Sequence, residues 1–130
     1  MEVLSVTEPS SENGLHGLFD SAVEYFEAGD VSAARDVLEQ LITKVPDDPQ
    51  ILNYLAVTTH QTGNSSQARE LFERAVQVEP NFVEAWRNLG NLTHEMGEFD
   101  QAIKAFSRLC KLTPNESSSF ICLGHAYQAD

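Results

Sequence analysis

A period of 34 residues is the feature that most constrains how this 130-residue chain folds. Four kinds of residue recur at that interval: one set of glycines, two sets of small residues and one set of prolines. The positions are Gly29, Gly63 and Gly97; Ala34, Ala68 and Ala102; Ala22, Ala56, Gly90 and Gly124; and Pro46, Pro80 and Pro114. Because four registers agree over three periods, the sequence predicts a structural unit that is repeated along the chain.

The recurring residues suit a pair of antiparallel helices joined by a tight turn. Glycine provides the left-handed backbone conformation that ends a first helix. Small residues let two helices approach closely, and proline stops the second helix. Asp30 and Asn64 are expected to cap second helices, and Pro49 suits a first helical position. In the first repeat Leu18, Ala22 and Tyr25 are expected to face the core.

The period divides the chain into a leader and a single all-α domain. Residues 1–14 are expected to form a flexible acidic leader, and residues 15–130 the repeat domain. The expected repeats are 15–48, 49–82 and 83–116, followed by a partial repeat or capping helix at 117–130. A second interpretation of the leader is an arm that folds back into a groove, with Val3, Leu4 and Val6 as its apolar contacts.

One motif carries a resemblance to a known family. Across residues 83–116 the motif residues are Trp86, Leu89, Gly90, Gly97, Ala102, Phe106 and Pro114. This pattern resembles the tetratricopeptide repeat family, and the resemblance covers about residues 15–130. It implies a right-handed superhelical solenoid of antiparallel helix pairs. It also implies that the first helices line a concave groove that binds an extended peptide or a partner helix.

Helical spacing on the first helices then gives the expected groove residues. They are Phe19, Val23, Phe26, Asn53, Val57, His60, Arg87, Asn91 and His94. The wall is expected to be apolar at its N-terminal end and polar further along. Phe19 and Phe26 have two open interpretations, because aromatic residues at helical spacing also serve ordinary packing.

Two specialised grooves of the family are not expected here. The carboxylate clamp of chaperone-binding members needs a lysine and an asparagine where this chain has Phe19 and Val23, and Arg87 is the only base on the wall. The asparagine ladder of O-linked N-acetylglucosamine transferases has one matching rung, Asn88. The equivalent positions hold Asp20, Tyr54 and Cys122, so no ladder is expected.

The charge of the chain bears on its partners. Twenty acidic side chains against eight basic ones give a net charge of −12. Residues 1–64 carry 11 acids and 2 bases, so the excess is concentrated there. An acidic surface repels phosphate backbones, so nucleic acid is excluded as a partner, and a basic protein or peptide segment is favoured. The alternative is that the acidity only keeps the chain in solution.

No catalytic, metal or cofactor motif is present. The carboxylates are spread over helix faces, and His60 and His94 lie one period apart on separate helices, too far apart to share zinc. Cys110 and Cys122 have no pairing framework, which is typical of thiols in a reducing compartment. No apolar run could cross a membrane and no secretory signal opens the chain, so a cytoplasmic location is expected.

The C-terminal segment restarts the first-helix motif with Phe120, Ile121, Leu123 and Tyr127. A capping helix normally turns a polar face to water, so these apolar residues predict self-association or an N-terminal piece of a longer repeat protein. The alternative is a natural cap. Two functions follow: a non-enzymatic protein-interaction module, or the substrate-recruiting or dimerising arm of a larger enzyme such as a glycosyltransferase.

Overall fold

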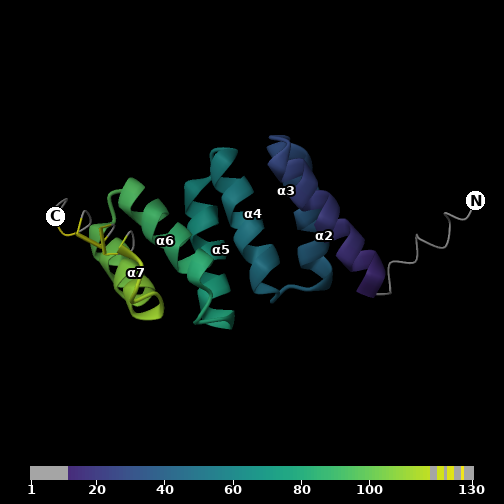
Figure 1. Cartoon of the computed structure of the whole chain (residues 1–130). Coiled ribbons are helices and arrows are strands. Elements are labelled where there is room, and N and C mark those ends of the chain that lie inside the picture. Colours follow the sequence, from purple (N-terminus) through teal and green to yellow (C-terminus); the bar gives the residue numbers. More distant parts are fainter. Residues whose placement is uncertain (1–11, 118–119, 122, 125–126, 128–130) are drawn as a thin grey trace, which may run out of the picture.

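The computed structural model describes residues 12–117, 120–121, 123–124 and 127, and this part of the chain is all-α (Figure 1). Its helices are α2 (Glu12–Glu27), α3 (Val31–Lys44), α4 (Pro49–Gln61), α5 (Ser65–Val78), α6 (Val83–Glu95) and α7 (Phe99–Leu112). The predicted fold class, helix pairs stacked into a solenoid, is confirmed.

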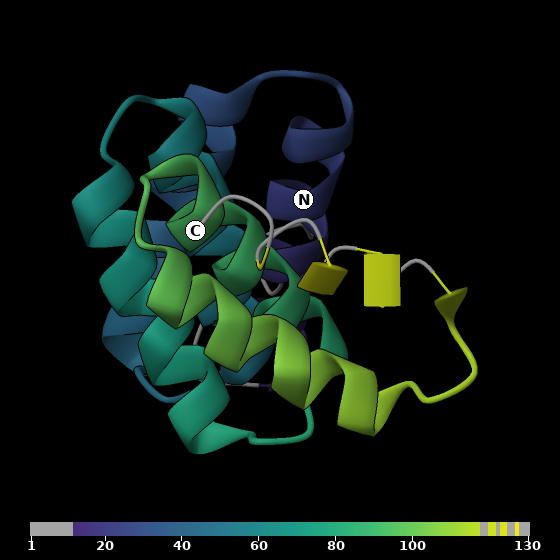
Figure 2. The same ribbon diagram turned by 90° about the vertical axis from the view of Figure 1, so that its left-hand side faces the viewer.

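The helices form three pairs that follow one another along the molecule. Packing is strongest within the pairs α2–α3, α4–α5 and α6–α7, and α3–α4 and α5–α6 join neighbouring pairs. Helix α4 also contacts α6, so first helices of successive pairs meet on one side. In Figure 1 the pairs stand in a row, and Figure 2 looks along that row from the α7 end. No pair hides its apolar face alone, which is why the stack is the stable unit.

The turn glycines end the first helices as the sequence predicts. Gly29, Gly63 and Gly97 have φ angles of 88°, 98° and 82°, in the left-handed region. In the second turn the backbone N–H of Gly63 donates to the carbonyl of His60 at 2.9 Å, and that of Asn64 donates to Thr59 at 3.0 Å. The same two bonds recur in the other turns, so all three helices end in one hydrogen-bonding pattern.

The predicted helix starts are partly correct. Asp30 accepts a hydrogen bond from the backbone N–H of Ala33, and Pro49 opens α4 behind the capping residue Asp48. Asn64 is the N-cap residue of α5, as predicted, but its side chain makes no capping bond. Its amide N–H donates to the Oε1 atom of Gln67 at 2.9 Å.

The small residues lie where the helices cross. Ala34, Ala68 and Ala102 are fully buried. A Cβ atom added to Gly90 would lie 2.5 Å from the ring of Phe106, so this crossing has no room for a side chain. Tyr25 departs from the prediction and is 43% exposed. The following repeats have buried threonines, Thr59 and Thr93, at the equivalent position.

The N-terminal end of the chain differs from the expected boundary. Helix α2 begins at Glu12, three residues before the expected start of the repeat domain at residue 15, and residues 1–11 of the leader lie outside the described residues. After α7, the described residues from Ser117 to Tyr127 are helical. Leu123 packs against the buried cluster of α7, which consists of Ala102, Phe106 and Leu109.

Candidate functional site

A cavity of about 480 Å³ opens on the side formed by the first helices. Its lining residues are Phe19 and Phe26 from α2; Gln50, Asn53, Tyr54 and Val57 from α4; and Phe82, Glu84 and Asn88 at the start and along α6. All three repeats contribute, so the cavity exists only because the pairs stack. We call this set the groove cavity.

The α2 end of the groove cavity is aromatic. The ring of Tyr54 meets Phe19 and Phe26 edge to face, with centroid distances of 5.5 Å and 5.6 Å. All three rings are half-buried. Such T-shaped pairs add stability beyond the area they bury. The two phenylalanines therefore pack against the neighbouring repeat and still present an apolar surface to the cavity.

The α6 end of the groove cavity is polar. The Nδ2 atom of Asn88 donates to the Oδ1 atom of Asn53 at 3.0 Å, across the two helices. Asn53 is only 9% exposed, so this bond meets the polar requirement of a nearly buried amide. One amide–amide bond leaves further N–H and carbonyl groups of both side chains open to the cavity.

Two of these contacts have the same spacing. Phe19 meets Tyr54, and Asn53 meets Asn88, and in each pair the partners lie 35 residues apart. In both pairs a residue of one first helix contacts the residue one period and one position later on the next. The 34-residue pattern in the sequence marks equivalent positions, whereas contacts across the stack join positions that are not equivalent.

Arg87 does not reach the groove cavity. Its guanidinium pairs with Glu84 at 3.4 Å and with Glu116 at 2.9 Å. Two carboxylates therefore share one positive charge, and the local balance is negative. On α6 the cavity wall consists of Glu84 and Asn88, which lie one helical turn apart.

The other expected groove residues lie apart from the cavity. His60 contacts Ser65 Oγ through Nδ1 at 3.0 Å and Glu95 through Nε2 at 3.3 Å. The ring of His94 packs edge to face on Phe99, 5.3 Å between centroids. Val23 is half-buried and Asn91 is exposed. Of the expected set, the cavity brings together Phe19, Phe26, Asn53 and Val57. The other expected residues do not line it: Val23, His60, Arg87, Asn91 and His94.

Sequence reasoning missed five members of the groove cavity: Gln50, Tyr54, Phe82, Glu84 and Asn88. Helical spacing does not place Tyr54 and Asn88 on the wall, although both stand at positions of the asparagine ladder. A template that pairs each position with the one 35 residues later includes both of them. Phe82 lies just before α6, so helical spacing along that helix does not include it.

A smaller cavity of about 230 Å³ adjoins the groove cavity and shares Phe19 and Gln50 with it. Leu15, Leu41 and Ile51 give it a mainly apolar lining between α2, α3 and α4. Its position extends the apolar end of the groove cavity toward the start of α2.

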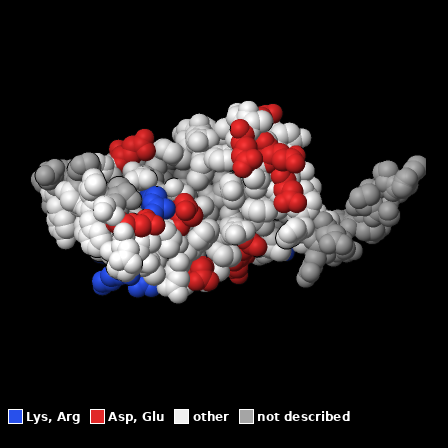
Figure 3. All heavy atoms as spheres, viewed as in Figure 1, with Lys and Arg blue, Asp and Glu red and all other residues white. Residues whose placement is uncertain are grey.

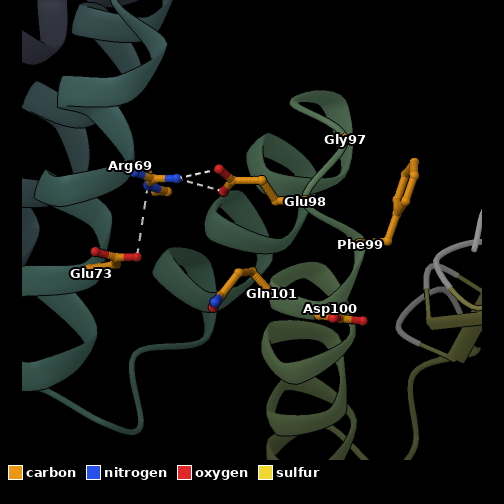
Figure 4. A pocket seen from close by; sticks show the side chains of 7 residues that line it. All are labelled: Arg69, Glu73, Gly97, Glu98, Phe99, Asp100 and Gln101. Atoms are coloured by element: carbon orange, nitrogen blue, oxygen red, sulfur yellow. Dashed lines mark hydrogen bonds and ion pairs between the residues drawn. The ribbon is translucent and has the colours of Figure 1, made fainter.

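A third cavity, of about 600 Å³, lies on the side of the second helices (Figure 4). There Arg69 reaches from α5 to both carboxylate oxygens of Glu98, with one N–O distance of 2.6 Å, while Phe99 points away from the pair. The hydrogen bond and charge of Glu98 raise the pKa of Arg69 above its ordinary value. Because Arg69 is already paired with both Glu73 and Glu98, we interpret the site as a structural contact between neighbouring repeats.

Charge differs along the molecule. On the face drawn in Figure 3, acidic side chains gather over the α2–α3 end. Beside the groove cavity the side chains of Glu84 and Glu116 are 64% and 50% exposed. In the described part of the chain Arg87 is the only base paired with them. The surroundings of the cavity therefore carry more negative than positive charge.

The described residues contain neither a candidate metal site nor a candidate membrane span. No three His, Cys, Asp or Glu side chains lie close enough together to hold a metal ion. Within the same part of the chain, no helix combines the length and the apolar character needed to cross a bilayer.

Comparison with known proteins identifies relatives of the fold. A family model described as tetratricopeptide repeat matches residues 19–77 and 61–117. The first TPR domain of Spaghetti (RPAP3), bound to the HSP90 peptide SRMEEVD, has a TM-score of 0.84 and 19% identity, covering 92% of this chain and 94% of that one. No curated protein sequence matches the chain significantly.

Two further structures have the same arrangement. The Yersinia enterocolitica type III secretion chaperone SycD, in complex with a peptide of the translocator YopD, has a TM-score of 0.82 and 14% identity, covering 91% of this chain and 95% of that one. The MamA protein has a TM-score of 0.84 and 20% identity, covering 88% of this chain. The chain spans 63% of the length of that MamA structure. At these identities the likeness concerns the fold alone.

Proposed function

The chain belongs to the tetratricopeptide repeat family, and we propose that it is a protein-interaction module that binds a partner segment in the groove cavity. The module carries out no catalytic step of its own and works in the cytoplasm. The observation that carries the proposal is the groove cavity, which three successive first helices build together.

The chemistry of the cavity supports binding of a polypeptide. Its volume of about 480 Å³ lies within the range of roughly 300–1,000 Å³ that is usual for ligand sites. Apolar rings at one end and paired amides at the other give an apolar contact surface with a few oriented polar groups. The neighbouring structures that contain HSP90 and YopD peptides show that this fold holds peptides in those proteins.

Site-directed photo-crosslinking tests the proposal. A photoreactive amino acid in place of Val57, inside the groove cavity, is expected to capture a partner from extract of the source organism. The matched control carries the same amino acid in place of Gln77, an exposed residue of α5. Asn88→Ala is expected to weaken capture at the groove position, because it removes the amide pair. Equal capture at both positions would contradict a groove-binding function.

We also propose self-association through the C-terminal segment. Phe120, Ile121 and Tyr127 are 49%, 56% and 59% exposed, which is unusual for large apolar side chains on one segment. A second copy that presents the same face would bury these residues symmetrically. This surface is separate from the groove cavity, so the two proposals can be tested independently.

A further inference from the structure

We infer that the partner of the groove cavity is an extended segment with one large apolar side chain and, about three residues away, a lysine or arginine. This inference rests on the proposed function and specifies the chemistry of its partner. It also excludes acidic segments and chain ends that are recognised by their carboxylate.

The apolar requirement comes from the α2 end of the groove cavity. Phe19, Phe26 and Tyr54 meet one another at their ring edges and remain partly open to the cavity. Val57 adds an aliphatic wall beside them. No charged side chain of α2 or α4 lines this end, so an apolar side chain would lose water there without leaving a charge unpaired.

The extended conformation follows from the amide pair. Asn53 and Asn88 use one N–H and one carbonyl oxygen on each other, which leaves donors and acceptors of both amides for a ligand. A peptide bond of an extended chain offers a matching N–H and carbonyl. In a partner helix these backbone groups are already used within the helix, so it would not satisfy the remaining donors and acceptors of the two amides.

The basic residue follows from the charge around Glu84. Glu84 lines the cavity and shares Arg87 with Glu116, so two carboxylates face one guanidinium. A partner lysine or arginine beside Glu84 would balance the remaining negative charge. A partner carboxylate would be repelled, and Arg87 is already engaged by both glutamates.

The spacing follows from the stacking of the helices. The aromatic end lies between α2 and α4, and Glu84 lies on α6, beyond the amide pair. Neighbouring helices pack about 8–10 Å apart, and an extended chain advances about 3.3 Å per residue. Moving from one end of the cavity to the other therefore takes about three residues of partner.

Selection from a random-peptide display library on the intact chain tests the inference. Enriched peptides are synthesised with a fluorescent label, and their Kd is measured by anisotropy at low and high salt. We expect peptides that combine an apolar residue with a lysine or arginine. Serine in place of the apolar residue should weaken binding by roughly tenfold or more, and glutamate in place of the base by roughly two- to fivefold.

Two variants of the chain form a matched pair. Glu84→Gln should weaken the binding of basic peptides roughly two- to fivefold, and the Kd should depend less on salt. Asp36→Asn, on an exposed position of α3, changes the net charge by the same amount and should leave affinity unchanged. Thermal melts of both variants are compared, so that a loss of binding is not confused with a loss of folding.

The outcomes separate the two proposals. Peptides that lose affinity with Asn88→Ala but are acidic, or bind Glu84→Gln as well as the unchanged chain, would overturn the inference and leave the groove function standing. Selected peptides that are indifferent to Asn88→Ala and to Tyr54→Ala, or a selection that enriches none, would overturn both. The expected motif with a Glu84-dependent affinity supports both.

Discussion

Two residues, Gly90 and Asn53, show most clearly how single positions shape this fold. Gly90 lies on α6 directly under the ring of Phe106, which is itself 2% exposed. Asn53 keeps a polar amide at 9% exposure because Asn88 hydrogen-bonds it. The first could be predicted from the sequence as a close helix crossing. The second could not, because its partner lies on another repeat.

A substitution at Gly90 tests the close crossing. Gly90→Ala should lower the free energy of unfolding by about 2 kcal/mol, and Gly90→Leu by more, because the added Cβ would meet a buried ring at 2.5 Å. The measurement is urea unfolding followed by circular dichroism.

The matched control for that substitution is Gly17→Ala in α2. A Cβ atom there meets nothing within 4 Å, so alanine should raise stability by roughly 0.5 kcal/mol through its better helix propensity. If both substitutions change stability by the same amount and sign, the close approach at Gly90 has no energetic consequence.

At the scale of elements, several helix boundaries are specified by residues at the ends of the helix itself. Pro49 and Asp48 start α4, and the turn glycines end the three first helices. These features act over a few residues, so the sequence alone predicts them well. Asn64 shows the limit: it stands at the predicted N-cap of α5, but its side chain bonds to Gln67 and makes no capping bond.

Two helix starts give a paired prediction about capping. Asp48 Oδ1 accepts from the backbone N–H groups of Gln50 at 2.9 Å and Ile51 at 3.1 Å. Asp48→Ala should therefore cost about 1 kcal/mol of stability. Asn64→Ala should cost less than about 0.5 kcal/mol, because that side chain makes no capping bond. Thermal melts of the two variants are compared, and a larger loss at Asn64 would contradict the assigned caps.

At the scale of the whole molecule, the repeats are joined by contacts that recur along the stack. Arg74 donates to the carbonyl oxygen of Pro46 at 2.7 Å, and Arg108, one period later, donates to that of Pro80 at 3.5 Å. Each arginine thus bonds to the loop that follows the preceding second helix. These hydrogen bonds help to set how far each helix pair is offset from its neighbour. The groove cavity depends on that offset.

Self-association is the prediction that belongs to this scale. Sedimentation velocity over a range of concentrations should show dimers, and Ile121→Ser should shift the equilibrium toward monomers by removing a residue that is 56% exposed. Val78→Ser is the control, because Val78 is also exposed, at 42%, but lies on α5. A strictly monomeric chain at high concentration would rule out this surface as an interface.

The sequence by itself determined the paired helices, the left-handed turns at the glycines and the small residues at the helix crossings. Each of these is a short-range steric effect that recurs with the period and needs no knowledge of the neighbouring repeat. Only the tertiary structure decided that Tyr54 meets Phe19, that Asn88 meets Asn53 and that Arg87 is held between two glutamates. Those contacts depend on the angle and offset at which rigid helix pairs stack, and that geometry comes from many packing contacts acting together.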